Sequence, residues 1–228
     1  MLGGEADRRL TSILIRAEAA QAEHEAELHR LRHVELAEAM RKLEEADAEK
    51  ARLVAELRLR AVELERMARE DALTRVSNRR YLIERVEAEF VRARRFDRDL
   101  TAVMVDADRF KEVNDRISHS AGDEVLRRLA RILADTCRAV DAAGRWGGEE
   151  FLVLLVEAPS AGAASVCEKI RVAVEDHPWE EVAPGLRVTV GLGHAALIPD
   201  MKTADALIHA ADVALYRAKD AGWNCVRG

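Results

Sequence analysis

The distribution of glycine and proline constrains the fold of this chain more than any other feature of its sequence. No glycine occurs between Gly4 and Gly122, and all four prolines lie within residues 159–199. Glycine and proline are the residues that most readily interrupt a helix. Residues 5–121 must therefore be mostly helical, whereas the rest of the 228-residue chain must contain turns.

Residues 1–70 are predicted to form a helical stalk. From residue 5 they are rich in Ala, Glu, Arg and Leu, the composition of a long helix. Two positions of a seven-residue repeat are apolar and form what we call the apolar seam: Leu36, Leu43, Leu57 and Leu64 at one position, and Met40, Val54, Ala61 and Ala68 at the other. Such a repeat is typical of a left-handed coiled coil, so we expect two copies of the chain to dimerise along this stalk and to transmit a signal through it. Asp47 and Lys50 interrupt the seam, and the alternative is a solvated single helix.

Charge, cysteine content and hydropathy exclude several classes of protein. A net charge of −6 argues against a nucleic-acid backbone as the main partner. Three widely spaced cysteines without a CxxC motif are typical of reduced thiols. No apolar run reaches the ~18 residues of a membrane helix, so we expect no membrane contact and a cytoplasmic location. An upstream sensory domain or a partner protein is compatible with the stalk.

Residues 71–228 alternate between apolar strands and amphipathic helices, which predicts an α/β or α+β domain with a central sheet. Helices are expected over residues 78–95, 109–117, 122–138, 161–175 and 203–221. Strands are expected over residues 100–105, on both sides of a turn at Gly147–Gly148 with the second at 151–156, over 186–192, and briefly at the end of the chain.

Two acidic clusters lie where a chemical site could form. Asp106 follows an apolar strand, and Glu149 and Glu150 lie at the tip of the predicted hairpin beside Gly147 and Gly148, which let a ligand approach the backbone. Carboxylates from two neighbouring strands would suit Mg²⁺ or Mn²⁺, which in enzymes often hold phosphates. By itself, however, a turn with two glutamates is more often only solvated.

Four motifs in this domain resemble the GGDEF family of diguanylate cyclases. Residues 147–151 resemble its signature in the GGEEF form; residues 106–115, His119 and residues 122–123 resemble its DxDxFKxxND…H…GD run; residues 71–80 resemble its opening DxLTxxxNRR; and residues 211–224 resemble its closing motif. The resemblance covers residues 71–226 in order and spacing. It implies a palm-like nucleotidyl-cyclase fold, with a mostly antiparallel five-stranded sheet flanked by helices.

The resemblance also implies a reaction. The family condenses two GTP molecules into cyclic di-GMP and releases two pyrophosphates, with one GTP bound to each of two facing domains. A monomer cannot close that ring alone. A dimerising stalk would therefore raise the effective concentration of one half-site for the other.

Residue roles follow from the resemblance, position by position. Asp106, the backbone carbonyl of Ala107, Glu149 and Glu150 match the family's metal ligands. Glu149 also matches the base for the 3′-hydroxyl, and Lys111 matches a lysine that stabilises charge in the transition state. Attack at a phosphate requires both charge neutralisation and proton removal, which agrees with these roles.

Other matches concern the substrate and the product. Asn114 and Asp123 match the residues that recognise guanine, and their oxygens can accept the hydrogens of its N1 and N2 atoms. The remaining substrate-site matches are Phe110, His119, Gly147, Gly148 and Lys219, the last of which contacts the triphosphate. Arg138 and Asp141 match the RxxD of an inhibitory site for cyclic di-GMP, for which Arg171 is a candidate partner arginine from a second domain.

The sequence departs from the family pattern at a few positions. Trp223 stands where many members carry an arginine that contacts phosphate, so GTP binding should weaken unless another residue substitutes. Ser118 replaces a glycine, and Gly191 replaces a serine. Ala72 and Arg75 replace a proline and a glycine, so we expect the stalk helix to run further towards the domain. Trp223 and Ser118 motivate an alternative function, a catalytically weak module that binds cyclic di-GMP or GTP and signals through its coiled coil.

Overall fold

The computed structural model describes residues 3–228, with side chains from residue 14 onward. Residues 1–2, the start of the predicted stalk, lie outside the described residues. The elements are α1 (Gly3–Arg69), α2 (Arg79–Phe96), β1 (Leu100–Ala107), α3 (Phe110–Arg116), α4 (His119–Thr136), β2 (Ala142–Gly147), β3 (Glu150–Val156), α5 (Ser160–Glu175), a short 3-10 helix (Trp179–Glu181), β4 (Val190–Ala196), α6 (Ala204–Asp220) and β5 (Val226–Arg227). They fall into two compact units, Met1–Val62 and Glu63–Gly228. The long helix expected for the stalk is confirmed, while the predicted boundary at residue 70 stays a prediction.

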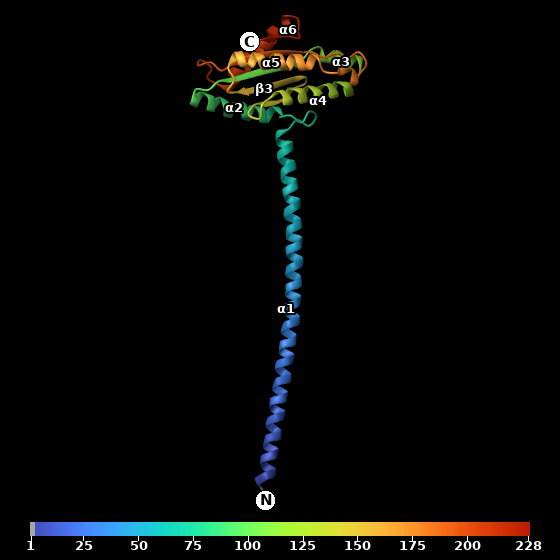
Figure 1. Ribbon diagram of the computed structural model, residues 1–228, viewed down its shortest axis with the longest axis vertical. Helices are drawn as coiled ribbons and strands as arrows, with labels where there is room; N and C mark the ends of the chain where they lie inside the picture. The colour runs from blue at the N-terminus through green and yellow to red at the C-terminus, as the bar shows by residue number, and fades with distance from the viewer. Residues whose placement is uncertain (1–2) are drawn as a thin grey trace. The chain divides into compact units, whose positions relative to one another are not determined.

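The second unit is built on one five-stranded sheet in the order β2-β3-β1-β4-β5. Strand β1 pairs antiparallel with both β3 and β4, β2 pairs antiparallel with β3, and only β4 and β5 run parallel. The predicted mostly antiparallel sheet is therefore confirmed. Every residue of β1 is buried, because this central strand is covered on both faces by helices (Figure 1).

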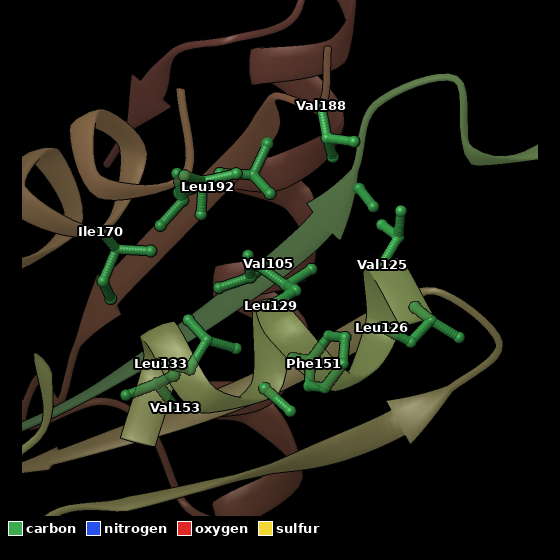
Figure 2. Packing of buried hydrophobic residues seen from close by; sticks show 14 of the residues in the cluster. Val105, Val125, Leu126, Leu129, Leu133, Phe151, Val153, Ile170, Val188 and Leu192 are labelled. Atoms are coloured by element: carbon green, nitrogen blue, oxygen red, sulfur yellow. The ribbon is translucent and has the colours of Figure 1, made fainter. Parts of the chain in front are cut away.

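Alternating residues of β1 divide the core into two clusters. Val103 and Val105 belong to a cluster with α4 and α5 on one face, and Ala102 and Met104 belong to another with α2 and α6 on the opposite face. Figure 2 shows the first cluster, in which side chains of α4 lie against residues of the sheet such as Phe151. Because residues alternate between faces, the next residue of the α6-facing set is Asp106.

The strand predicted over residues 186–192 was misplaced, since β4 spans Val190–Ala196. Leu186 and Val188 are buried with an exposed residue between them, which is the strand-like pattern that the prediction relied on. A ladder needs a partner, however, and the register of β1 against β4 ends with Ala107 opposite Val190. Residues before Val190 are buried without belonging to the sheet.

The expectation that α1 runs further towards the domain was wrong, because α1 ends at Arg69. The Asp71 carboxylate accepts hydrogen bonds from the backbone N–H and the hydroxyl of Thr74, which form a turn. The Asn78 amide donates to the carbonyls of Ala68 and Glu70, which α1 leaves without helical partners. Side chains thus end this helix without proline or glycine.

Ser118 also has a local structural use. It is the N-cap of α4, and its hydroxyl accepts a hydrogen bond from the backbone N–H of Ala121. Serine is a preferred N-cap residue. The helix predicted from residue 122 therefore begins earlier, at His119.

The packing of α6 on β4 depends on a glycine, and a matched pair of variants tests this. A Cβ at Gly193 would overlap the backbone of α6 at Ala211 and Leu215, whereas one at Gly191 would meet its nearest neighbour, Leu215 Cδ1, at 3.4 Å. We predict that Gly193→Ala lowers the free energy of unfolding by about 1–3 kcal/mol or more. Gly191→Ala should stay within about 1 kcal/mol of the native chain. Urea unfolding measures both, and equal losses would contradict this packing.

Candidate functional site

The candidate site is built around Asp106, near the end of the central strand. The register places its Cα opposite Glu150 of β3 and Gly191 of β4. Its side chain is only 9% exposed, and its Oδ2 lies 2.8 Å from Nζ of Lys219 in the last turn of α6. An apolar strand, a hairpin and a helix end therefore meet at one buried carboxylate.

The electrostatics of Asp106 reflect this crowding. Burial raises the pKa of its carboxyl above the usual value, the hydrogen bond and charge of Lys219 oppose that rise, and the charges of Glu149 and Glu150 add to it. Negative charge from two strands therefore converges here, and one ammonium group only partly compensates for it.

The hairpin tip beside Asp106 is open. Gly147 and Gly148 are exposed, and a Cβ added to either would meet nothing within 4 Å. Gly148 has a φ of +52°, a left-handed conformation that suits glycine. The Arg145 side chain donates to the carbonyl of Gly148 over 2.8 Å, and the backbone N–H of Ala107 donates to the carbonyl of Glu149 over 3.4 Å. The tip is thus fixed on one side and accessible on the other.

These carboxylates fit a hard divalent cation in their chemistry. Asp106, Glu149 and Glu150 supply oxygen atoms, which Mg²⁺ and Mn²⁺ prefer. The negative charges of Glu149 and Glu150 help to raise the pKa of Asp106, and the ammonium group of Lys219 already lies against the Asp106 carboxylate. Within residues 14–228, no group of three or more His, Cys, Asp or Glu side chains is arranged to hold a metal ion. Metal ligation by these residues stays a prediction.

A second group of predicted site residues lies where α3 meets α4. A Cβ at Gly122 would overlap the amide oxygen of Asn114 and would lie 3.1 Å from Phe110. Glycine at this position therefore lets the Asn114 side chain lie against the first turns of α4, at the residue before Asp123. Phe110 is buried, Asn114 is half-buried and Asp123 is exposed, so the two polar side chains border accessible space.

Lys111 and His119 are both exposed. Neither belongs to an ion pair or a side-chain hydrogen bond within the part of the chain whose side chains are described. Lys111 is close to Asp106 in the sequence, and His119 is close to Gly122. Among the described side chains, however, neither residue contacts Asp106.

Asp108 is a structural residue of the site to which the sequence assigned no role. It is 8% exposed, and its Oδ2 accepts hydrogen bonds from the Thr189 hydroxyl at 2.6 Å and from the backbone N–H of Asn224 at 2.9 Å. Its Oδ1 is buried without a partner, and a Cβ at Gly191 would lie 3.5 Å from that atom. Asp108 therefore fixes the loop after α6 to the end of β1. The DxD motif includes Asp108, but the motif alone does not indicate that its carboxylate accepts hydrogen bonds from Thr189 and Asn224.

A link between Asp71 and Arg145 was also not predicted. Arg145 Nη1 lies 3.4 Å from Asp71 Oδ1, and its Nε holds the hairpin tip. Although burial raises the pKa of Asp71, hydrogen bonds from Thr74 and the charge of Arg145 hold it below its usual value. The turn after α1 is therefore connected to the glycine-rich tip through one arginine.

The predicted inhibitory pair is a fixed local unit. The Asp141 carboxylate accepts from the backbone and side chain of Arg138 and from the backbone N–H of Val156. Burial raises the pKa of Asp141, but these hydrogen bonds and the Arg138 charge hold it below its usual value. The Arg138 side chain stays 57% exposed. A cavity of about 490 Å³ lies beside the pair and is also lined by Arg69, Arg75 and Tyr81.

Arg171, the candidate second arginine of that site, is engaged within its own domain. It forms ion pairs of 2.7 Å with Glu168 and with Glu175 and donates to the side chain of Asn224. Its side chain is only 16% exposed. The structure thus gives Arg171 a role in fixing the loop that contains Asn224.

Comparison with known proteins gives consistent matches. The profile described as "Diguanylate cyclase, GGDEF domain" matches residues 68–225. The response regulator PleD of Caulobacter vibrioides is 39% identical over 161 residues, which are 69% of this chain and 35% of that protein. Diguanylate cyclase DgcM of Escherichia coli is 39% identical over 164 residues, which are 72% of this chain and 39% of that protein. The chain thus spans well under half the length of these relatives.

Two solved structures resemble the chain beyond the sheet domain. One contains the coiled coil and GGDEF domain of DgcB from Caulobacter crescentus with c-di-GMP; it has a TM-score of 0.74 and 27% identity and covers 81% of this chain and 98% of that one. The other is diguanylate cyclase SiaD of Pseudomonas aeruginosa with its activator SiaC; it has a TM-score of 0.67 and 31% identity and covers 97% of this chain and 87% of that one. No helix in the described part of the chain has the length and apolar character that crossing a membrane requires.

Proposed function

Since the chain belongs to the GGDEF family of diguanylate cyclases, we propose that it condenses two GTP molecules into cyclic di-GMP and two pyrophosphates. The observation that carries this proposal is the convergence of Asp106, Glu149 and Glu150 beside Lys219 at one end of the sheet. A residue-by-residue match to the family's motifs supports the proposal, because the carboxylates, the lysines and the guanine-site residues are all present.

In the proposed reaction, the 3′-oxygen of one GTP attacks the α-phosphorus of the other. A new O–P bond forms, the bond from the α-phosphorus to the bridging oxygen breaks, and pyrophosphate leaves. Glu149 accepts the proton of the 3′-hydroxyl, and Lys111 stabilises the negative charge that develops on the phosphate. The same exchange with the roles of the two nucleotides reversed closes the ring.

The residues that would hold a divalent cation are Asp106, Glu149, Glu150 and the backbone carbonyl of Ala107. A bound Mg²⁺ or Mn²⁺ would neutralise charge on the phosphates. Lys219 contributes a positive charge from the end of α6. Gly147 and Gly148 leave the tip without side chains, so phosphate oxygens can approach its backbone.

Guanine recognition is assigned to Asn114 and Asp123. Asn114 lies against Gly122, which directly precedes Asp123 in the chain. The amide oxygen and the carboxylate can accept from the N1 and N2 hydrogens of guanine, which adenine does not offer in the same arrangement. Phe110 and His119 complete the substrate site in this proposal.

The stalk is proposed to pair two chains so that their half-sites meet. The seam residues that lie in the first unit are exposed, with Leu36 58% exposed and Leu43 and Leu57 each 63% exposed. A helix with such a stripe gains stability by burying it against a second copy. We assign residues 1–70 to this stalk and residues 71–228 to the catalytic domain. An upstream domain or a partner protein would supply the signal, as SiaC does for SiaD, whose activator it is.

The RxxD pair is proposed to bind cyclic di-GMP and inhibit the enzyme. Asp141 holds Arg138 in place through three hydrogen bonds, and the exposed guanidinium borders the 490 Å³ cavity. An arginine can bind phosphate or the edge of a guanine.

The alternative function, a catalytically weak module that binds GTP or cyclic di-GMP, rests on Trp223. This residue is 40% exposed where many family members carry a phosphate-contacting arginine. The alternative predicts that nucleotide binds without detectable cyclisation.

The first prediction concerns the base. Incubated with GTP and Mg²⁺, the chain should form cyclic di-GMP, detected by mass spectrometry. Glu149→Gln should lower kcat by about 10²–10⁴-fold, because the 3′-hydroxyl loses its proton acceptor. The control Glu87→Gln changes an exposed residue of α2 and should leave kcat unchanged. Absence of product from the native chain would contradict the proposed activity and favour the weak module.

The second prediction concerns the dimer. Cyclase activity per chain should fall on dilution, because two half-sites must meet. Leu57→Asp alters the apolar seam and should lower activity about tenfold or more at low protein concentration. Leu59→Asp is the matched control, since Leu59 is 74% exposed and points away from the seam. Analytical ultracentrifugation reports the dimer directly. Equal effects of the two variants would refute pairing along this seam.

The third prediction concerns inhibition by product. Arg138→Ala should raise the cyclic di-GMP concentration that halves the initial rate by about tenfold or more, because a charge-assisted contact is lost. Arg131→Ala removes an exposed arginine of α4 that is not among the residues lining the 490 Å³ cavity, and it should have no such effect. Thermal unfolding checks that both variants remain folded. Unchanged inhibition in Arg138→Ala would place the product elsewhere.

A further inference from the structure

At the start of α3 an arginine, Arg109, lies against Trp223 in the loop after α6, the residue that departs from the family pattern. Trp223 stands where many family members carry a phosphate-contacting arginine. The guanidinium carbon of Arg109 lies 4.3 Å from the centre of the Trp223 ring, within the range of a cation–π interaction. Sequence motifs alone give no hint of this contact, because the two residues are more than a hundred positions apart.

The contact is fixed by the residues next to Arg109 and Trp223 in the chain. Arg109 directly follows Asp108, and Trp223 directly precedes Asn224, whose N–H donates to Asp108 over 2.9 Å. Arg109 and Trp223 both adopt left-handed backbone conformations, with φ of 53° and 64°. Such conformations are costly for residues other than glycine and persist where the surrounding structure holds them. Arg109 and Trp223 therefore lie in contact because the residues next to them, Asp108 and Asn224, are joined by a hydrogen bond.

The same two segments carry Asp106 and Lys219 to the proposed phosphate site. Arg109 comes three residues after Asp106, and Trp223 comes four residues after Lys219, whose Nζ lies 2.8 Å from Asp106. Arg109 is exposed, and it has no ion-pair partner among residues 14–228. Together with Trp223 it lines a cavity of about 600 Å³ that Asp108, Glu112 and Asn224 also line; Asp106 and Lys219 lie outside this lining. A guanidinium at this place is available to an anionic ligand.

We propose that Arg109 supplies the phosphate-binding cation that Trp223 does not provide. The aromatic and the cationic side chain form a pair in which the cation extends from the start of α3 instead of from the loop after α6. Trp223 restricts the orientations of the guanidinium, and the guanidinium binds oxygens of the GTP triphosphate. This inference rests on the proposed function, because it assumes that GTP occupies the site.

The test measures binding separately from turnover. Calorimetry with a non-hydrolysable GTP analogue and Mg²⁺ gives Kd, and initial rates of cyclic di-GMP formation give KM and kcat. Arg109→Ala should weaken analogue binding and raise KM by about tenfold or more, as expected for loss of a charge-assisted contact. Its kcat at saturating GTP should change by less than about threefold. Arg116→Ala, which removes another arginine of the same cavity, should leave Kd and KM unchanged.

An exchange variant separates a binding role from a structural one. In the double variant Arg109→Trp with Trp223→Arg, the cation returns to the loop after α6. Analogue affinity should recover to within about threefold of the native chain, whereas the single variant Arg109→Trp should bind as weakly as Arg109→Ala. Thermal unfolding establishes that each variant is folded.

Three results would overturn the inference: Arg109→Ala binding the analogue as tightly as the native chain, Arg116→Ala weakening it equally, or the exchange variant failing to recover. A native chain that binds the analogue but forms no cyclic di-GMP would refute the proposed cyclase activity and leave the role of Arg109 standing. A native chain that does not bind the analogue would refute both.

Discussion

The register between β1 and β3 is the constraint on which the rest of the site depends. It sets Asp106 opposite Glu150 and directs Asp106 towards the face covered by α6, where Lys219 meets it. Val105 points to the other face and is fully buried there. A slip by one residue would exchange these two side chains, placing a carboxylate in an aliphatic core. The hydrophobic alternation that stabilises the sheet thus also determines where the negative charge converges.

Much of the fold follows from local patterns in the sequence. The composition of residues 5–70 predicted the long helix α1, and apolar runs located β1 and β3 because both are buried over nearly their whole length. The predictions were wrong where an element depends on a partner elsewhere in the chain, because the local sequence pattern does not identify that partner. Leu186 and Val188 are buried on either side of an exposed residue, as in a strand, but they belong to no ladder because the register between β1 and β4 ends with Ala107 opposite Val190. The stalk helix ends at Arg69 because the side chains of Asp71 and Asn78 satisfy nearby backbone groups.

In the candidate site, too, the sequence identified individual residues but not the long-range contacts that position them. Motif spacing identified the carboxylates, and the structure gathers Asp106 with Lys219 and places Asn114 against Gly122. The contacts that position these residues join segments far apart in the chain: Asp108 with Asn224, Asp71 with Arg145, and Arg109 with Trp223. No local periodicity encodes such pairs. Trp223 shows the consequence, because its departure from the family pattern can be interpreted only when its neighbour Arg109 is known.

A crystal structure with 3′-deoxy-GTP and Mg²⁺ would show whether the end of β1 binds the substrate, because this nucleotide can bind but lacks the attacking hydroxyl. We predict guanine between Asn114 and Asp123, the triphosphate beside Lys219 and Arg109, and a metal ion held by Asp106 and the hairpin glutamates. A nucleotide bound away from the end of β1, or carboxylates left without a metal ion, would contradict this prediction.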